Sequence, residues 1–92
     1  MAANLLYRIE YMAPNSSQGL FIHGYADNDF VAYSTVVYFI GGPGAVGHVQ
    51  LTQGETYRHV DGTVAHEIYV QNLAPDNPCA VDVIQLVESY PL

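Results

Sequence analysis

The residues of this sequence that could carry chemistry begin with two histidines, His59 and His66, which flank the dipeptide Asp61-Gly62. Asp-Gly is typical of a two-residue β-hairpin loop, because both positions accept positive φ. With that loop Tyr57 pairs with His66, and the two-residue period of strands places His59 and His66 on one face. Neighbouring imidazoles are typical ligands of zinc or copper, and the ordinary pKa of histidine is about 6.5. The pattern therefore predicts a metal site, or a pH-sensitive pair, at His59 and His66.

A metal ion at this hairpin needs a further ligand from elsewhere in the chain. The candidates are His23, His48 and Glu55. The alternative interpretation is two partly exposed histidines on a sheet face, with no ligand. We predict no resident cofactor. The alternatives are zinc at these histidines and calcium at the acidic segment Asp27-Asn28-Asp29.

A second candidate site is the polar segment Asp27-Asn28-Asp29, which closely follows Tyr25. Carboxylate and amide oxygens are ligands for calcium, and beside a tyrosine ring they also suit a sugar. The segment lacks the glycine and the distant glutamate of an EF-hand loop. Asp and Asn are equally typical of a plain tight turn. We predict ligand binding at Tyr25, Asp27, Asn28 and Asp29, with a plain turn as the alternative.

Tyrosine is abundant, with eight among 92 residues and no tryptophan. A tyrosine ring combines a large apolar face with a polar tip, which suits both interfaces and sugar stacking. Strand alternation predicts that half of the tyrosines serve the core, namely Tyr7, Tyr11, Tyr33 and Tyr57. The other half are the candidates for a binding surface, namely Tyr25, Tyr38, Tyr69 and Tyr90.

No motif indicates an enzyme, and we predict no catalytic residues. Cys79 is the single cysteine, and neither histidine nor methionine follows it, which excludes a blue-copper motif. No serine lies in a nucleophile-elbow motif. The glycine-rich segment Gly41-Gly42-Pro43-Gly44 is not followed by the lysine of a phosphate-binding loop.

Charge excludes further classes of function. The net charge is −7, there is no lysine, and Arg8 and Arg58 are the two arginines. Binding a phosphate backbone needs a cluster of basic side chains, so we predict no nucleic-acid partner. No apolar run approaches the roughly 18 residues of a spanning helix, so we predict no membrane insertion. The beginning of the sequence has no basic, then apolar, segment, so we expect a cytoplasmic protein or one exported without a cleavable signal peptide.

The elements that must position these residues are short strands. Val, Ile, Tyr, Phe and Thr recur in runs that are separated by Gly, Pro, Asn and Asp, and no helical period occurs. This pattern predicts an all-β fold, a single-domain antiparallel β-sandwich over residues 1–92 with about seven strands, or alternatively a small β-barrel. The seven predicted strands are Asn4–Met12, Leu20–Tyr25, Phe30–Ile40, His48–Gln53, Glu55–Val60, Thr63–Asn72 and Ala80–Ser89.

The shortage of charge predicts association. Lysine, inward charges and proline normally protect the edges of sheets, and this chain has few of them. A small sandwich of this composition exposes apolar patches as a monomer, so we predict a homo-oligomer. The first hypothesis is a non-enzymatic, lectin-like module that binds carbohydrate. The alternatives are a self-assembling shell, fibre or crystal-forming subunit, and a small histidine-dependent metalloprotein or enzyme.

Overall fold

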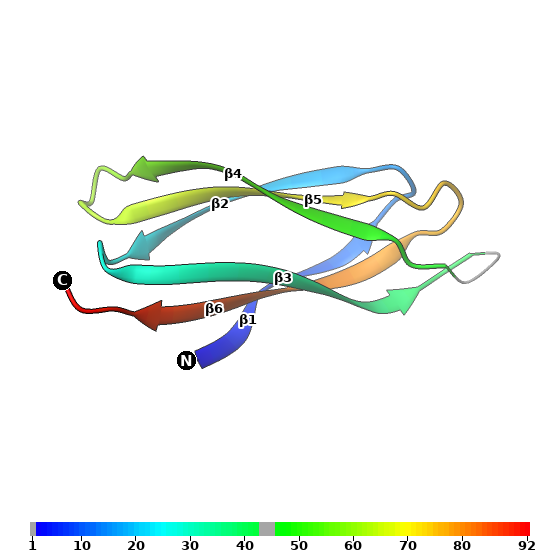
Figure 1. The fold of residues 1–92 in the computed structure, drawn as a ribbon. Coiled ribbons are helices and arrows are strands. Elements are labelled where there is room, and N and C mark those ends of the chain that lie inside the picture. Colours follow the sequence, from blue (N-terminus) through cyan, green and yellow to red (C-terminus); the bar gives the residue numbers. More distant parts are fainter. Residues whose placement is uncertain (1, 43–45) are drawn as a thin grey trace.

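The runs of β-branched and aromatic residues form six strands in the computed structural model, which describes residues 2–42 and 46–92 (Figure 1). Pro43 and Gly44, in the predicted break after the third strand, lie outside the described residues. No helix among the residues described is long and apolar enough to span a membrane. The strands are β1 (Ala2–Met12), β2 (Ser17–Tyr25), β3 (Asp29–Ile40), β4 (Val49–Arg58), β5 (Val64–Asn72) and β6 (Cys79–Ser89).

The strands form two antiparallel sheets that stack face to face (Figure 1). Sheet A has the order β1-β6-β3, and sheet B has the order β2-β5-β4. The predicted β-sandwich is therefore confirmed, whereas the barrel alternative is wrong because the two sheets remain separate. The Cα trace measures 50 × 25 × 16 Å along its principal axes, so the molecule is long and thin.

The structure has six strands where the sequence predicts seven. The predicted strands on either side of Gly54 are one strand, β4, because a β-bulge between Gln53 and Thr56 absorbs the glycine within the ladder. A Cβ on Gly54 would lie 2.9 Å from a carboxylate oxygen of Glu67, so a larger residue here would displace the end of that side chain. β2 also begins at Ser17, three residues earlier than predicted.

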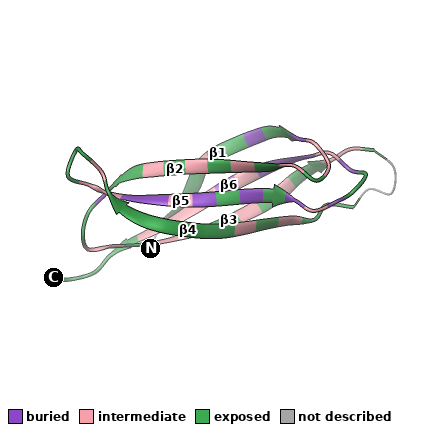
Figure 2. Ribbon diagram, turned by 90° about the horizontal axis from the view of Figure 1, so that it is seen from above, coloured by how far each residue is buried: buried purple, intermediate pink, exposed green. Residues whose placement is uncertain are grey.

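The core lies between the two central strands, β5 and β6. The side chains of Ile68 and Val70 on β5 and of Val81 and Val83 on β6 are fully buried. Figure 2 shows buried residues along β5, with the mostly exposed β4 beside it. Alternation along β5 buries one face and leaves the other towards solvent, as expected for an antiparallel sheet.

The first strand contributes to this core in an unexpected register. The sequence predicts Leu5, Tyr7, Ile9 and Tyr11 on one face, but Leu6, Ile9 and Met12 are the residues that pack against the core. Register shifts between Leu5 and Tyr7 and between Ile9 and Met12 interrupt the alternation. Tyr7 and Tyr11 are therefore exposed, and their predicted place in the core is wrong.

The β4–β5 hairpin turns at Asp61-Gly62 as predicted, but its loop has three residues rather than two. The His59 N–H donates to the Thr63 carbonyl (2.8 Å), and the Gly62 N–H donates to the His59 carbonyl (2.9 Å). Gly62 has a φ of 88°, the left-handed conformation that closes three-residue hairpins. Arg58 consequently pairs with Val64, and the ladder near the turn is shifted by one residue from the predicted register.

A buried asparagine at the opposite end of β5 fastens the loops. The Asn72 side-chain amide donates to the carbonyls of Met12 (3.3 Å), Ala13 (3.2 Å) and Asn77 (2.9 Å). Its oxygen accepts the Ala74 N–H (3.0 Å). Asn72 is fully buried, so these bonds are formed away from water and hold the chain where it passes between the sheets.

Replacement of this asparagine tests the fold. Asn72→Ala leaves buried backbone groups without a partner, and we expect the free energy of unfolding to fall by about 2–4 kcal/mol. Urea unfolding followed by circular dichroism measures the change. The control is Gln71→Ala, an exposed neighbour on the same strand, for which we expect a change below about 0.5 kcal/mol. Equal destabilisation by the two variants would contradict the assigned role.

Candidate functional site

The predicted ligand-binding residues of the β2–β3 turn use their side chains to fasten that turn. The Asp27 carboxylate accepts from Arg58 (2.6 Å). The Asn28 amide donates to the Tyr90 carbonyl (2.7 Å). The Asp29 carboxylate accepts from the Ala26 N–H (2.8 Å) and from the Ser89 hydroxyl (2.7 Å). These bonds match the alternative interpretation, a plain turn whose polar groups stabilise the connection itself.

Tyr25, the aromatic member of that predicted site, points into the sandwich. Its side chain is buried, and its hydroxyl donates to Gln85. The prediction that Tyr25 lies on the surface is therefore wrong. Tyr25 is the last residue of β2, and a register shift between His23 and Tyr25 takes it off the exposed face that His23 occupies.

The structure separates the predicted metal pair, His59 and His66. His66 opposes Thr56 on the inner face of sheet B and is buried, whereas His59 lies on the outer side. The predicted pairing is wrong because the additional loop residue shifts the register by one, and a shift of one residue exchanges the two faces of a strand.

His66 belongs to an internal polar network instead. Its Nδ1 lies 2.8 Å from the Tyr33 hydroxyl, which donates to the Tyr25 hydroxyl (3.1 Å). The ring of His66 also stacks on the Tyr25 ring, with centroids 5.2 Å apart. Burial lowers the pKa of His66 and raises the pKa of both tyrosines. The imidazole and the two hydroxyls therefore stay neutral, and this end of the core contains hydrogen bonds but no buried charge.

The outer face of sheet B carries a cluster of exposed rings. Phe21 on β2 lies 5.7 Å from Tyr57 on β4 and 6.1 Å from His59, measured between ring centroids. The Tyr57 hydroxyl donates to the Glu55 carboxylate (3.1 Å). Tyr69 on β5 is 44% exposed on the same face. We call this cluster, Phe21, Tyr57 and Tyr69, the aromatic face.

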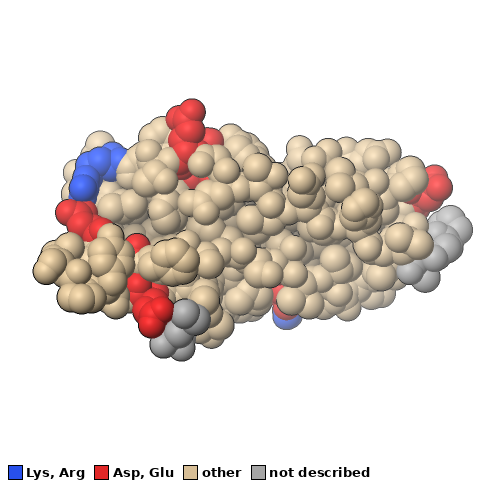
Figure 3. Space-filling view, viewed as in Figure 1, with Lys and Arg blue, Asp and Glu red and all other residues tan. Residues whose placement is uncertain are grey.

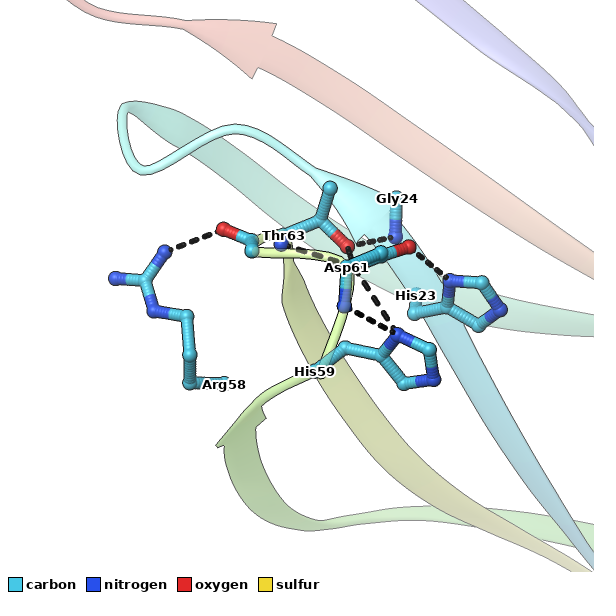
Figure 4. Close-up of polar contacts among 7 residues, drawn as sticks. His23, Gly24, Arg58, His59, Asp61 and Thr63 are labelled. Carbon is cyan, nitrogen blue, oxygen red and sulfur yellow. Dashed lines mark hydrogen bonds and ion pairs between the residues drawn. The ribbon is translucent and has the colours of Figure 1, made fainter.

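One end of the aromatic face meets the tip of the hairpin, where His23, His59 and Asp61 converge (Figure 4). The two imidazole rings stack with centroids 4.0 Å apart and planes inclined by 7°. His23 Nδ1 lies 3.1 Å from one carboxylate oxygen of Asp61, and His59 Nδ1 lies 3.0 Å from the other. Among the residues described, this is the one group of three His, Cys, Asp or Glu side chains whose ligand atoms converge, and it includes neither Asp27 nor Asp29.

Local hydrogen bonds hold the Asp61 carboxylate in place (Figure 4). One oxygen accepts both the hydroxyl (2.6 Å) and the N–H (2.9 Å) of Thr63. These two bonds, assisted by His59, hold the pKa of the Asp61 carboxyl well below its usual range. The Thr63 hydroxyl also accepts the Gly24 N–H (3.0 Å), which ties the hairpin tip to β2.

Comparison with known proteins identifies no relative, since no family model, curated protein or solved structure matches the chain. The site is therefore interpreted from its own geometry.

Sequence reasoning proposed His23 only as a third ligand, and it did not select Phe21. The signal that was available is the alternation of Gly19, Phe21 and His23 along one face of β2. It could not be used from the sequence alone, because nothing in the sequence places β2 beside β5.

The buried histidine predicts a pH dependence of stability. Because the pKa of folded His66 is below its unfolded value of about 6.5, the unfolded chain binds a proton that the folded chain does not. This contribution is present above about pH 6.5 and is lost as the pH falls towards the folded pKa. We expect the free energy of unfolding to decrease from pH 7 to pH 5, with a slope from this proton of at most about 1.4 kcal/mol per pH unit.

Urea unfolding at pH 7 and pH 5 measures this dependence. His66→Gln keeps a hydrogen-bonding partner for Tyr33 and cannot titrate, so its free energy of unfolding should vary less with pH than that of the wild type. His48→Gln, at an exposed position, should behave like the wild type. An unchanged pH dependence in His66→Gln would refute the assignment.

Proposed function

We propose that this chain is a non-enzymatic binding module that works as a homo-oligomer, with the outer face of sheet A as its self-association surface. The observation that carries the proposal is the number of large apolar side chains on this face. Leu5, Phe30, Val36 and Tyr38 are 51%, 55%, 52% and 43% exposed, respectively. They flank Ile84 and Leu86 of β6, which are partly exposed. We call these six residues the sheet A patch.

Charge on this face is partly compensated, with Glu88 left at the end of the patch, where it opposes Phe30. Arg8 and Asp82 form an ion pair on the same face, with the Arg8 Nε 2.7 Å from a carboxylate oxygen, so they neutralise each other. The Arg8 guanidinium also lies 4.6 Å from the centroid of the Tyr38 ring. Figure 3 views the two stacked sheets from the side, and on the side that it shows the charged groups gather mainly towards one end. Broad apolar surface of this kind is typical of interaction sites.

Association would relieve the cost of exposing these side chains. Burying one Leu, Val or Phe side chain contributes about 1.5–3 kcal/mol. In a two-fold interface each residue of the patch is buried in both copies, so every contribution counts twice. The patch therefore supports a closed dimer that packs sheet A against sheet A.

The sheet edges support a second candidate, a self-assembling structural subunit. Each three-stranded sheet leaves two edges, and none of the four edge strands contains lysine or proline. Among the four edge strands, β3 has the longest run of uncharged residues, from Phe30 to Ile40. An open edge of this kind pairs readily with another chain, and repeated pairing gives fibres or sheets instead of a closed oligomer.

The aromatic face supports carbohydrate as the ligand of the module. Phe21 and Tyr57 present half-exposed rings, and the Glu55 carboxylate beside Tyr57 supplies acceptors for sugar hydroxyls. Because this face lies on sheet B, a dimer through sheet A would display two such faces on opposite sides. Two sites that face opposite ways cannot engage one flat surface together, so the dimer would instead cross-link two glycan-bearing particles.

Multi-angle light scattering over a concentration series tests self-association. We expect a dimer in the wild type and a monomer for Val36→Lys, because loss of burial in both copies costs about 3 kcal/mol or more, over a hundredfold in affinity. The control is Val60→Lys at the fully exposed hairpin tip, which should remain dimeric. A wild-type monomer at every concentration would overturn the proposal, and mass that keeps growing with concentration would favour the structural subunit.

A glycan array followed by titration of the bound sugar tests the ligand. We expect Tyr57→Ala to weaken binding by about fivefold, because an aromatic contact is worth about 1 kcal/mol. Tyr11→Ala, an exposed tyrosine on an edge strand of sheet A, is the matched control and should bind normally. No retained glycan, or equal weakening by both variants, would argue against carbohydrate at the aromatic face.

A further inference from the structure

We propose that His23, His59 and Asp61 form a binding site for a divalent transition-metal ion of the zinc class, which we call the tip site. This inference is independent of self-association and of carbohydrate binding. The three residues come from β2 and from the β4–β5 hairpin, and each offers one ligand atom. These three atoms all lie within 4.8 Å of one another.

The spacing is close to what one ion requires. Nitrogen and oxygen ligands lie about 2.1 Å from zinc, so two ligands of a tetrahedral site are about 3.4 Å apart. The widest separation in the tip site, at most 4.8 Å, therefore has to contract by up to about 1.4 Å when the ion binds. Both Nδ1 atoms already face the Asp61 carboxylate, and the His59 Nδ1 also accepts the Asp61 N–H (3.3 Å), so binding of an ion requires rotation of the His59 ring and loss of that bond. The His23 side chain is 47% exposed and the His59 side chain 28% exposed, which leaves room for that rotation.

The surrounding hydrogen bonds orient the carboxylate as an outer shell does in metal sites. Thr63 donates twice to the Asp61 oxygen that faces His59, while the other oxygen faces His23. The bond from the Gly24 N–H to the Thr63 hydroxyl keeps β2 and the hairpin tip at a fixed separation. The ligands are therefore held near one another before any ion arrives.

The donor set selects the class of ion. Two imidazole nitrogens and one carboxylate suit zinc, copper(II) and nickel(II). Calcium and magnesium take oxygen ligands, with six or more positions for calcium, and this cluster offers only the Asp61 carboxylate. Three protein ligands leave a coordination position for water or for a group of a partner. The net charge of −7 also favours a cation.

Isothermal titration of the full-length, chelator-treated protein with Zn²⁺ tests the tip site. We expect one equivalent per chain, and a loss of affinity of at least about tenfold in His23→Ala and in His59→Ala, since even outer-shell changes cost ten- to a hundredfold. His48→Ala is the matched control, because His48 is exposed and outside the cluster, and it should bind like the wild type. Titration with Ca²⁺ should give no binding.

A measurement on the unmodified chain keeps the proposal testable if a variant fails to fold. In NMR spectra, Zn²⁺ should shift or broaden the ring signals of His23 and His59 and leave those of His48 and His66 unchanged. Absence of stoichiometric Zn²⁺ binding, Ca²⁺ binding of equal strength, or an equal loss in His48→Ala would overturn the proposal. The contacts among His23, His59 and Asp61 would then be hydrogen bonds and stacking alone.

Discussion

The packing of β5 against β6 is the constraint on which the rest of this molecule depends. Each is the one strand of its sheet with a neighbour on both sides, and together they supply the fully buried Ile68, Val70, Val81 and Val83. Two sheets of three strands can cover only their inner faces. The outer faces and four edge strands therefore remain exposed, and every candidate function of this chain lies on them.

The two outer faces differ in chemistry, and this difference gives them different roles in our proposals. The outer face of sheet A is broadly apolar, and Arg8 and Asp82 on it form an ion pair, so it suits contact with a second copy. The aromatic face of sheet B mixes rings with carboxylates and ends at the tip site. A metal ion at the tip site would be bound by His59, whose ring lies next to that of Phe21. One bound molecule would then contact both the ion and the aromatic face.

The sequence predicted the class of fold and the position of the hairpin, because these follow from short-range rules. Strand propensity and turn residues placed the all-β sandwich and the turn at Asp61-Gly62. Bulges were not predictable in the same way. The bulge at Gly54 joins two predicted strands into one. The register shifts in β1 expose Tyr7 and Tyr11, which the sequence places in the core. A bulge depends on which partner strand is available, and that information is not local.

The composition by itself determined that this chain is rich in strand-forming residues, has few charged residues and has no lysine to protect the edge of a sheet, because composition does not depend on folding. Only the tertiary structure decided which histidine meets which. One additional residue in the hairpin loop sends His66 into the core and leaves His59 outside, where β2 brings His23 against it. The side-chain period of a strand is two, so a shift of one residue changes every neighbour.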